Sequence, residues 1–202
     1  PGKKPLVYRH TEEGIWFASE LKSLLKDPTF DKEVDRQALD AYLEYQYVPH
    51  PRTIFKQAKK LPPAHWMMYR DGKLTIERYW RPAYHKESNR TWQEDKELVR
   101  STLTEATRIR MISEVPIGAF LSGGVDSTII VGLMQSLSSR PVKTFSIGFP
   151  VKEYDETDYA RLAAKYIGTE HHEYMVQPDA VSIVDELSYF YDEPFADSSA
   201  IP

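Results

Sequence analysis

Cysteine is absent from all 202 residues of this chain. Its absence excludes disulfides, thiolate metal sites and a cysteine nucleophile within these residues, and it fits a cytoplasmic protein. Long apolar runs are absent too. The longest, near residues 128–134, falls well short of the about 20 residues that span a bilayer. No long apolar segment follows the opening Pro-Gly-Lys-Lys, so the sequence shows no signal peptide, and we expect no membrane partner.

An excess of positive charge is lacking as well. The formal net charge is −4 and the sequence pI is about 5.9, so no overall field attracts nucleic acid. Hydrophobic residues make up 41% and charged residues 28% of the chain, which is typical of a globular protein. Because both ends fall in turn-like or polar segments, we expect the chain to be a piece of a longer protein.

The first 90 residues carry signals for short elements. Turn residues and β-formers predict four strands, at 6–8, 15–18, 66–69 and 74–76. Asp71-Gly72 should close the last two into a hairpin, because both residues tolerate the positive φ of a tight turn. Asp35 is expected to cap a helix that ends near Tyr45. We interpret Lys59-Lys60 as a solvent-exposed surface.

The rest of the chain alternates helices and strands. Short apolar segments predict strands at 117–121, 142–147 and 172–176. Helical patterns lie between and around them, at 91–109, 128–137 and 155–167 and from Pro178 onward. The helix at 128–137 is apolar on nearly every side, so we expect it to be buried. This alternation predicts an α/β fold, a doubly wound parallel sheet that binds its ligand beyond the carboxyl ends of its strands.

A glycine-rich motif lies between the first of these strands and the next helix. We call residues 122–127, Ser-Gly-Gly-Val-Asp-Ser, the glycine loop. The amides and partial positive charge of a helix start attract an anion, and Gly123 and Gly124 let the backbone approach it. Ser122 and Ser127 add hydroxyl donors. Asp126 would repel a bare phosphate, so we expect a Mg²⁺ that bridges its carboxylate and phosphate oxygens.

Two better-known phosphate motifs do not match, since neither a Gly-Lys-Ser/Thr nor a G-x-G-x-x-G pattern is present. Two other groups of residues invite a metal. The first is an acidic cluster, Asp155, Glu156 and Asp158, at the expected start of a helix. Because the helix dipole favours carboxylates there, we interpret the cluster as a helix start and not as a metal site. His171 and His172 are adjacent on a strand and face opposite sides, so they do not chelate one ion.

Several motifs in a fixed order make the sequence recognisable. They lie at 2–6, 17–24, 61–65, 77–80, 115–121 and 192–199. With the glycine loop, these segments resemble the asparagine synthetase family, in which a glutaminase domain is fused to an ATP-pyrophosphatase domain. The resemblance covers essentially the whole chain.

The resemblance implies a fold and a domain order. The doubly wound sheet would be of the adenine-nucleotide alpha-hydrolase kind, preceded by the β-rich tail of an N-terminal-nucleophile glutaminase domain. We expect that tail at residues 1–28, a connecting segment at 29–90 and the synthetase domain at 91–202.

The resemblance also implies a reaction. ATP, with Mg²⁺, would activate the side-chain carboxylate of aspartate as an adenylate and release pyrophosphate. Ammonia derived from glutamine would then displace AMP and give asparagine. A loop that holds the phosphates with Mg²⁺ stabilises the charge on departing pyrophosphate. The partners implied are small substrates, with no nucleic acid and no membrane, and the family is compatible with a homodimer of the full-length enzyme.

Carried over position by position, the resemblance assigns ATP and pyrophosphate to Leu121, Ser122, Gly123, Gly124, Asp126, Ser127 and Ile147. Asp126 would also bind the metal, and Asp197 and Ser198 would line the substrate pocket. No catalytic residue falls within the chain: the glutaminase cysteine would precede Pro1, and a Ser-Gly-Glu-Gly-Ser-Asp-Glu motif would follow Pro202. We therefore expect the chain alone to be inactive.

Three alternatives stay open. Members of the same family amidate other carboxylates or close β-lactam rings. ATP-pyrophosphatases of RNA modification carry a similar loop, although the acidic balance and the glutaminase-like first residues argue against that function. A non-catalytic nucleotide-binding protein would bind ATP without turnover.

Overall fold

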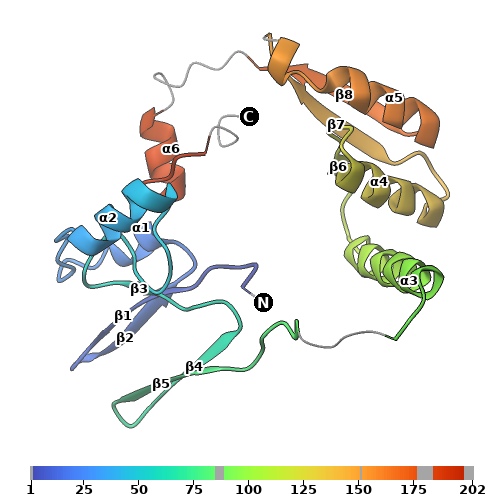
Figure 1. Ribbon diagram of the computed structural model, residues 1–202. Coiled ribbons are helices and arrows are strands. Elements are labelled where there is room, and N and C mark those ends of the chain that lie inside the picture. The colour runs from blue at the N-terminus through green and yellow to red at the C-terminus, as the bar shows by residue number, and fades with distance from the viewer. Residues whose placement is uncertain (1, 85–88, 151, 177–183, 198–202) are drawn as a thin grey trace. The chain divides into compact units, whose positions relative to one another are not determined.

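The computed structural model describes residues 2–84, 89–150, 152–176 and 184–197, except for the side chain of residue 154 (Figure 1). The chain divides into two compact units. The first comprises Pro1–Lys86 and Asp179–Ile201, and the second comprises Glu87–Pro178 and Pro202. The first unit therefore contains residues from both ends of the chain.

A three-stranded antiparallel sheet lies in the first unit. Its strands are β1 (Val7–Thr11), β2 (Gly14–Ala18) and β3 (Lys59–Lys60), in the order β2-β1-β3. β1 and β2, close to the first two predicted strands, form an antiparallel hairpin. β3 pairs with the other edge of β1 and places Lys60 opposite Val7.

A second hairpin joins β4 (His65–Arg70) to β5 (Lys73–Arg78) in antiparallel register. Asp71 and Gly72 form its turn with φ angles of 50° and 75°. Both angles are positive, as a tight two-residue turn requires, so the prediction from Asp-Gly is confirmed.

The described residues of the first unit also form three helices: α1 (Leu21–Leu24), α2 (Arg36–Tyr45) and α6 (Val184–Tyr191). Asp35 caps α2 as predicted, since its carboxylate accepts from the Gln37 amide at 3.0 Å. The predicted helix start at Pro178 lies outside the described residues. The core draws on β1, α1, α2 and the segments around them: Val7, Leu21, Leu24, Phe30, Ala38, Val48, Ile54 and Ala58.

The second unit contains a parallel sheet of β6 (Gly118–Phe120), β7 (Lys143–Gly148) and β8 (Glu170–Met175), in that order. Both neighbouring pairs are parallel. The predicted α/β fold with three parallel strands is therefore confirmed. The carboxyl ends of these strands meet at one edge of the sheet, which places the glycine loop and the segment after Gly148 at that edge.

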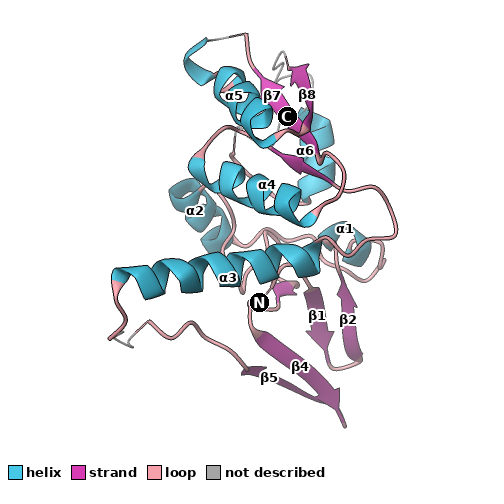
Figure 2. Ribbon diagram, turned by 90° about the vertical axis from the view of Figure 1, so that its right-hand side faces the viewer, coloured by secondary structure: helices cyan, strands magenta, loops and turns pink. Residues whose placement is uncertain are grey.

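Four helical segments accompany this sheet: α3 (Trp92–Arg110), α4 (Val125–Leu137), the 3₁₀ turn η1 (Lys152–Tyr154) and α5 (Thr157–Ile167) (Figure 2). α3 begins with a capping box, in which the Thr91 hydroxyl and the Glu94 carboxylate each accept a backbone hydrogen bond. α5 ends at Gly168, whose φ of 82° is left-handed, as expected of a helix C-terminus.

A small core holds α4 and α5 against the same sheet. It is built from Leu121 after β6, Val131 of α4, and Ala160 and Ala164 of α5. The expectation that α4 is buried all round is wrong, because Ile129 and its neighbour Ile130 are 44% and 37% exposed. Only one stripe of α4 contacts the sheet and α5, so the other apolar residues stay at the surface.

Candidate functional site

The glycine loop connects β6 to α4 in the second unit. Its two serine hydroxyls close it, since the Oγ atoms of Ser122 and Ser127 lie 3.0 Å apart. Ser122 Oγ also accepts from the Gly124 amide at 3.3 Å, and Ser127 Oγ donates to the Gly124 carbonyl at 3.2 Å. The loop is thus held by hydrogen bonds among its own residues, with both hydroxyls on the side of the helix start.

Gly124 is the N-cap of α4, and the first backbone bond of the helix runs from the Thr128 amide to the Gly124 carbonyl at 3.0 Å. The amides of residues 125–127 have no partner within the helix, because the first turn of any α-helix lacks acceptors. They make this end of α4 an anion-binding position, and the loop fits a phosphate group there.

Gly123 is required by two independent features. Its φ of 80° lies in the left-handed region that side-chain-bearing residues rarely adopt. A Cβ atom at this position would lie 2.5 Å from the backbone of Tyr159 and Ala160 at the start of α5. The loop backbone therefore packs directly on the neighbouring helix, which leaves no room for any other residue.

The other two predicted nucleotide positions lie at the ends of β6 and β7. Leu121 is 1% exposed, and its backbone already bonds to β7: its amide donates to the Phe145 carbonyl at 2.8 Å, and its carbonyl accepts from Ser146 Oγ. Ile147 is half-buried and pairs with Tyr174 of β8. The structure places both at the sheet edge that carries the glycine loop.

Asp126 lies in the first turn of α4 and is exposed. No group of three or more His, Cys, Asp and Glu side chains is arranged to hold a metal ion among the described residues. Asp126 can therefore supply a single carboxylate to a metal at the glycine loop, and a phosphate would have to complete the coordination.

The acidic cluster lies at the start of α5, as expected, with one correction. The N-cap is Glu156, one residue later than predicted. Asp155 instead accepts from both the amide and the hydroxyl of Thr157, at 3.3 Å and 3.0 Å. Asp158 pairs with Arg161 at 2.9 Å. These carboxylates serve the local structure of the helix start.

The two adjacent histidines have separate partners. His171 Nδ1 lies 2.9 Å from the Thr144 hydroxyl of β7, and the His172 ring stacks on Phe145 at 5.3 Å between centroids. The pair therefore does not converge on one point, in agreement with the alternation of side chains along a strand.

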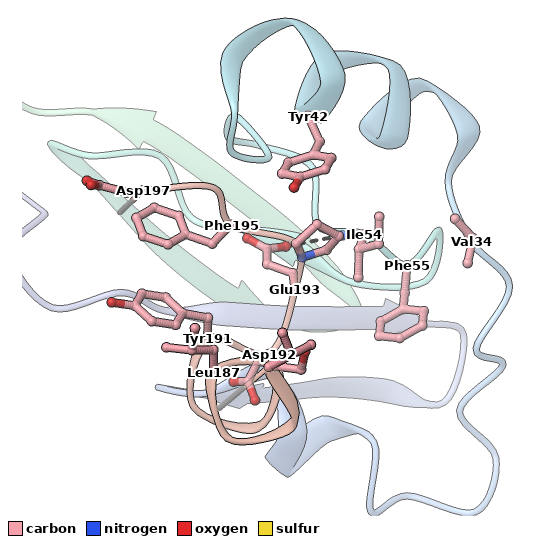
Figure 3. A pocket seen from close by; sticks show the side chains of 13 residues that line it. Val34, Tyr42, Ile54, Phe55, Leu187, Tyr191, Asp192, Glu193, Phe195 and Asp197 are labelled. Carbon is pink, nitrogen blue, oxygen red and sulfur yellow. Dashed lines mark hydrogen bonds between the residues drawn. The ribbon is translucent and has the colours of Figure 1, made fainter. Parts of the chain in front are cut away.

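Of the two predicted substrate residues, Asp197 belongs to the first unit. Ser198 lies outside the described residues, whereas Asp197 lines a pocket of about 530 Å³ (Figure 3). We call residues 192–197, which contain three carboxylates, the acidic loop. Figure 3 shows Glu193 within this pocket, with Tyr42 on one side and Asp192 on the other, and Asp197 farther along the loop.

Glu193 is the central contact of the acidic loop. Its side chain is 14% exposed and forms an ion pair with Lys60. Its Oε2 also accepts from the Ile54 amide at 3.2 Å. Burial raises the pKa of Glu193 above its usual value and outweighs the opposite effect of Lys60. Lys60 in turn donates to the Val48 carbonyl at 2.6 Å.

The interpretation of Lys59-Lys60 as a solvent-exposed pair is wrong for Lys60. A local pattern of two lysines on a short strand does not reveal a carboxylate more than 130 residues further along the chain. Glu193 lay within a motif that supports the family resemblance, yet nothing near it in the sequence pointed to a buried ion pair. Sequence reasoning therefore missed both partners.

Comparisons with known proteins agree with the two parts of the chain. Residues 1–80 match the family described as a glutamine amidotransferase domain. Residues 98–202 match the family described as asparagine synthase. The chain belongs to the asparagine synthase family. This assignment confirms the resemblance inferred from the motifs.

Individual relatives cover the whole chain. A protein described as putative asparagine synthetase [glutamine-hydrolyzing] 2 of Methanocaldococcus jannaschii is 36% identical over 212 residues, 100% of this chain and 40% of that protein. Asparagine synthetase [glutamine-hydrolyzing] 1 of Bacillus subtilis is 34% identical and is matched over 32% of its length. Amidase chry2 of Gibberella zeae is 26% identical over 97% of this chain. The chain thus spans about a third of the length of these relatives.

Within the described residues, no helix has both the length and the apolar character needed to cross a membrane.

Proposed function

We propose that this chain is part of a glutamine-hydrolysing asparagine synthetase, which converts aspartate into asparagine at the expense of ATP. The observation that carries the proposal is the glycine loop, closed by Ser122 and Ser127 at the start of α4 and packed through Gly123 on α5. This geometry supports the binding of a phosphate chain. The family assignment supports an ATP-dependent ligase.

In this proposal each residue of the loop has a role. The amides of residues 125–127 and the hydroxyls of Ser122 and Ser127 donate to pyrophosphate oxygens. Gly123 and Gly124 keep the backbone free of side chains where the phosphates approach. Leu121 and Ile147, at the ends of β6 and β7, lie where the rest of the nucleotide would extend along the sheet edge.

Asp126 would hold Mg²⁺ against the same phosphates. When bound, Mg²⁺ neutralises part of the negative charge on the triphosphate and on the pyrophosphate that leaves. The loop donors act on the same charge, because hydrogen bonds aimed at a developing anion lower the barrier to its departure. The aspartate carboxylate gains AMP as a leaving group, and ammonia then forms the amide bond.

Aspartate recognition is assigned to Asp197, the last residue of the acidic loop, and to Ser198, which follows it. We also propose the domain bounds expected from the sequence: glutaminase tail at 1–28, connecting segment at 29–90 and synthetase domain at 91–202. The glutamine amidotransferase match to residues 1–80 supports a glutaminase in the full-length enzyme.

The test is ATP–pyrophosphate exchange by the full-length protein, with a panel of carboxylates as acceptors. We expect exchange that requires both Mg²⁺ and aspartate and does not occur with glutamate or succinate. Amide formation should then be supported by glutamine and by free ammonia. Exchange that is independent of any acceptor, or nucleotide binding without exchange, would contradict the proposal.

A second candidate function is a ligase of the same chemistry with another carboxylate acceptor. It is favoured by the similarity to two fungal proteins described as amidases, chry2 and chyE, each 26% identical to this chain. The acceptor panel separates the two functions, because the second predicts exchange with a carboxylate other than aspartate.

A further inference from the structure

The acidic loop joins two parts of the chain that belong to different family matches. Residues 192–197 fall within the asparagine synthase match, 98–202, yet they fold in the first unit with the residues matched to the glutamine amidotransferase domain, 1–80. Outside α6, the loop forms ion pairs and hydrogen bonds with this second group of residues, at Lys22, Gln46, Ile54 and Lys60. The contact therefore joins residues of the two family matches within one compact unit.

Two ion pairs make this contact. Glu193 pairs with Lys60 of β3, and Asp192 Oδ1 pairs with Lys22 Nζ of α1 at 3.0 Å. The side chains of Asp192 and Glu193 are only 9% and 14% exposed. Asp192 also has a left-handed φ of 66°, which turns the chain sharply at the end of α6. Both carboxylates are thereby directed away from solvent and towards a lysine.

Two backbone contacts extend the attachment. The Ala196 amide donates to the Gln46 carbonyl at 3.0 Å, just after α2, and Glu193 Oε2 accepts from the Ile54 amide. The Phe195 ring stacks on Tyr191 at 4.5 Å between centroids. The loop is consequently held at successive points from Asp192 to Ala196, directly before Asp197.

We propose that Glu193 is a positioning residue: its buried pair with Lys60 sets the position of the acidic loop, and with it the proposed aspartate-binding residue Asp197, relative to the residues matched to the glutamine amidotransferase domain. The inference rests on the proposed function. Glu193 does not touch the reacting atoms. It acts through the loop that follows it.

The physical properties of a buried ion pair favour a role of Glu193 in positioning the loop over a role in stabilising the fold. A buried ion pair gains little net free energy, because two charges must first lose their water, but it is highly selective for one geometry. Glu193 illustrates this, since its burial works against its charged form. The Glu193 carboxylate is held by the Lys60 ammonium and the Ile54 amide. These two contacts fix the direction and the register of the loop more closely than apolar packing alone would.

The experiment compares Glu193→Gln with wild type in the full-length protein. Gln preserves the shape and can still accept from the Ile54 amide, but it removes the charge that Lys60 requires. We expect kcat/KM for aspartate to fall about 10- to 100-fold, the range caused by a displacement of about 1 Å in a substrate-binding group. Glutamine hydrolysed per pyrophosphate released should rise severalfold, while Tm stays close to that of wild type.

A matched control is available in the same unit. Glu33 and Lys56 form another Glu–Lys pair, but their side chains are 57% and 49% exposed. Glu33→Gln should leave kcat/KM and the ratio of the two products unchanged, because exposed pairs contribute little. Lys60→Arg should retain most activity, since it keeps the positive charge. Lys60→Met should lower kcat/KM as Glu193→Gln does, but unlike that variant it should also lower the stability, because it leaves the buried Glu193 carboxylate unpaired.

The outcomes are distinct. Wild-type kinetics in Glu193→Gln, or full recovery in the double variant Glu193→Gln/Lys60→Met, would overturn the inference, because no charged pair would then be needed. A loss of activity that only follows a loss of folded protein would overturn it as well. If the wild-type enzyme shows no aspartate-dependent exchange, the proposed function itself fails, and the inference fails with it.

Discussion

The glycine loop and the acidic loop are both short, polar segments at the end of a regular element, yet they are held in opposite ways. The glycine loop bonds to itself: the hydrogen bonds among Ser122, Gly124 and Ser127 span at most five residues. The acidic loop bonds to residues far away, and the contact from Ile54 to Glu193 spans 139 residues.

The two loops should therefore tolerate different kinds of substitution. Backbone conformation and close packing define the glycine loop, so a single methyl group at Gly123 meets the backbone of Tyr159 and Ala160. Side-chain charges define the acidic loop, so its geometry depends on Lys22 and Lys60. Steric changes should therefore disrupt the first loop, and charge changes should disrupt the second.

The largest effect is expected at Asp126, the single carboxylate of the glycine loop. Asp126→Asn in the full-length enzyme should lower ATP–pyrophosphate exchange at least about 100-fold and leave glutamine hydrolysis largely intact, because preorganised electrostatic groups contribute on this scale. Asp158→Asn is the control, an exposed acid in the first turn of α5, and should change exchange by less than about threefold. Retained exchange in Asp126→Asn would contradict the metal role.

The second prediction tests whether close packing at Gly123 determines the conformation of the glycine loop. Gly123→Ala should cost at least about 1–3 kcal/mol of stability through strain at positive φ, and it should also displace the loop and lower exchange about 100-fold. Gly132→Ala is the matched control, because its Cβ would enter open space in the middle of α4. That variant should gain about 0.5–1 kcal/mol. Denaturant unfolding measures the stability of each variant, and the exchange assay measures its activity. If Gly123→Ala and Gly132→Ala show the same stability and the same exchange rate, the packing of the loop on α5 is unimportant.

The third prediction tests whether the ion pair of Glu193 with Lys60 determines the conformation of the acidic loop. Lys60→Met leaves the buried Glu193 carboxylate without its ammonium partner. We expect the unfolding free energy to fall by about 2 kcal/mol, less than for a fully buried pair because the Lys60 side chain is 25% exposed. Lys56→Met, at the exposed pair, should stay within about 0.5 kcal/mol of wild type. If both variants lose the same stability in denaturant titrations, the two pairs are equivalent and the comparison fails.

The smallest effect is a pH dependence specific to Glu193. Its pKa is raised in the folded protein, so its contribution to stability is present below its unfolded pKa of about 4.3 and is lost as pH rises through the raised value. The unfolding free energy of wild type relative to Glu193→Gln should therefore decline from acidic towards neutral pH.

Other carboxyl groups have lowered pKa values, so their contributions to stability change with pH in the opposite direction. Hydrogen bonds from Thr29 hold the pKa of Asp27 below its usual value, and Arg161 lowers that of Glu173. Their contributions are lost as pH falls through those lowered values. Because they occur in wild type and in the variant alike, they cancel in the difference. A difference that is flat with pH would contradict the raised pKa of Glu193.

The sequence by itself determined the features that depend on neighbouring residues. The Asp71-Gly72 turn, the Asp35 cap, the Thr91 capping box and the Gly168 helix end were all predictable, because each is decided by backbone conformations and hydrogen bonds within a few residues. The parallel sheet was also predictable, since alternating strands and helices allow few other arrangements. The glycine loop belongs to the same class.

Only the tertiary structure decided the features that depend on distant partners. It showed that α4 is buried along one stripe, that Lys60 faces a carboxylate, and that residues after α6 fold with β3, α1 and α2. Burial of a charge depends on which surfaces meet, and an ion pair acts over a few ångströms in space whatever the separation along the chain. The glycine loop could therefore be recognised from its own six residues, whereas the partners of the acidic loop became visible only once the chain had folded.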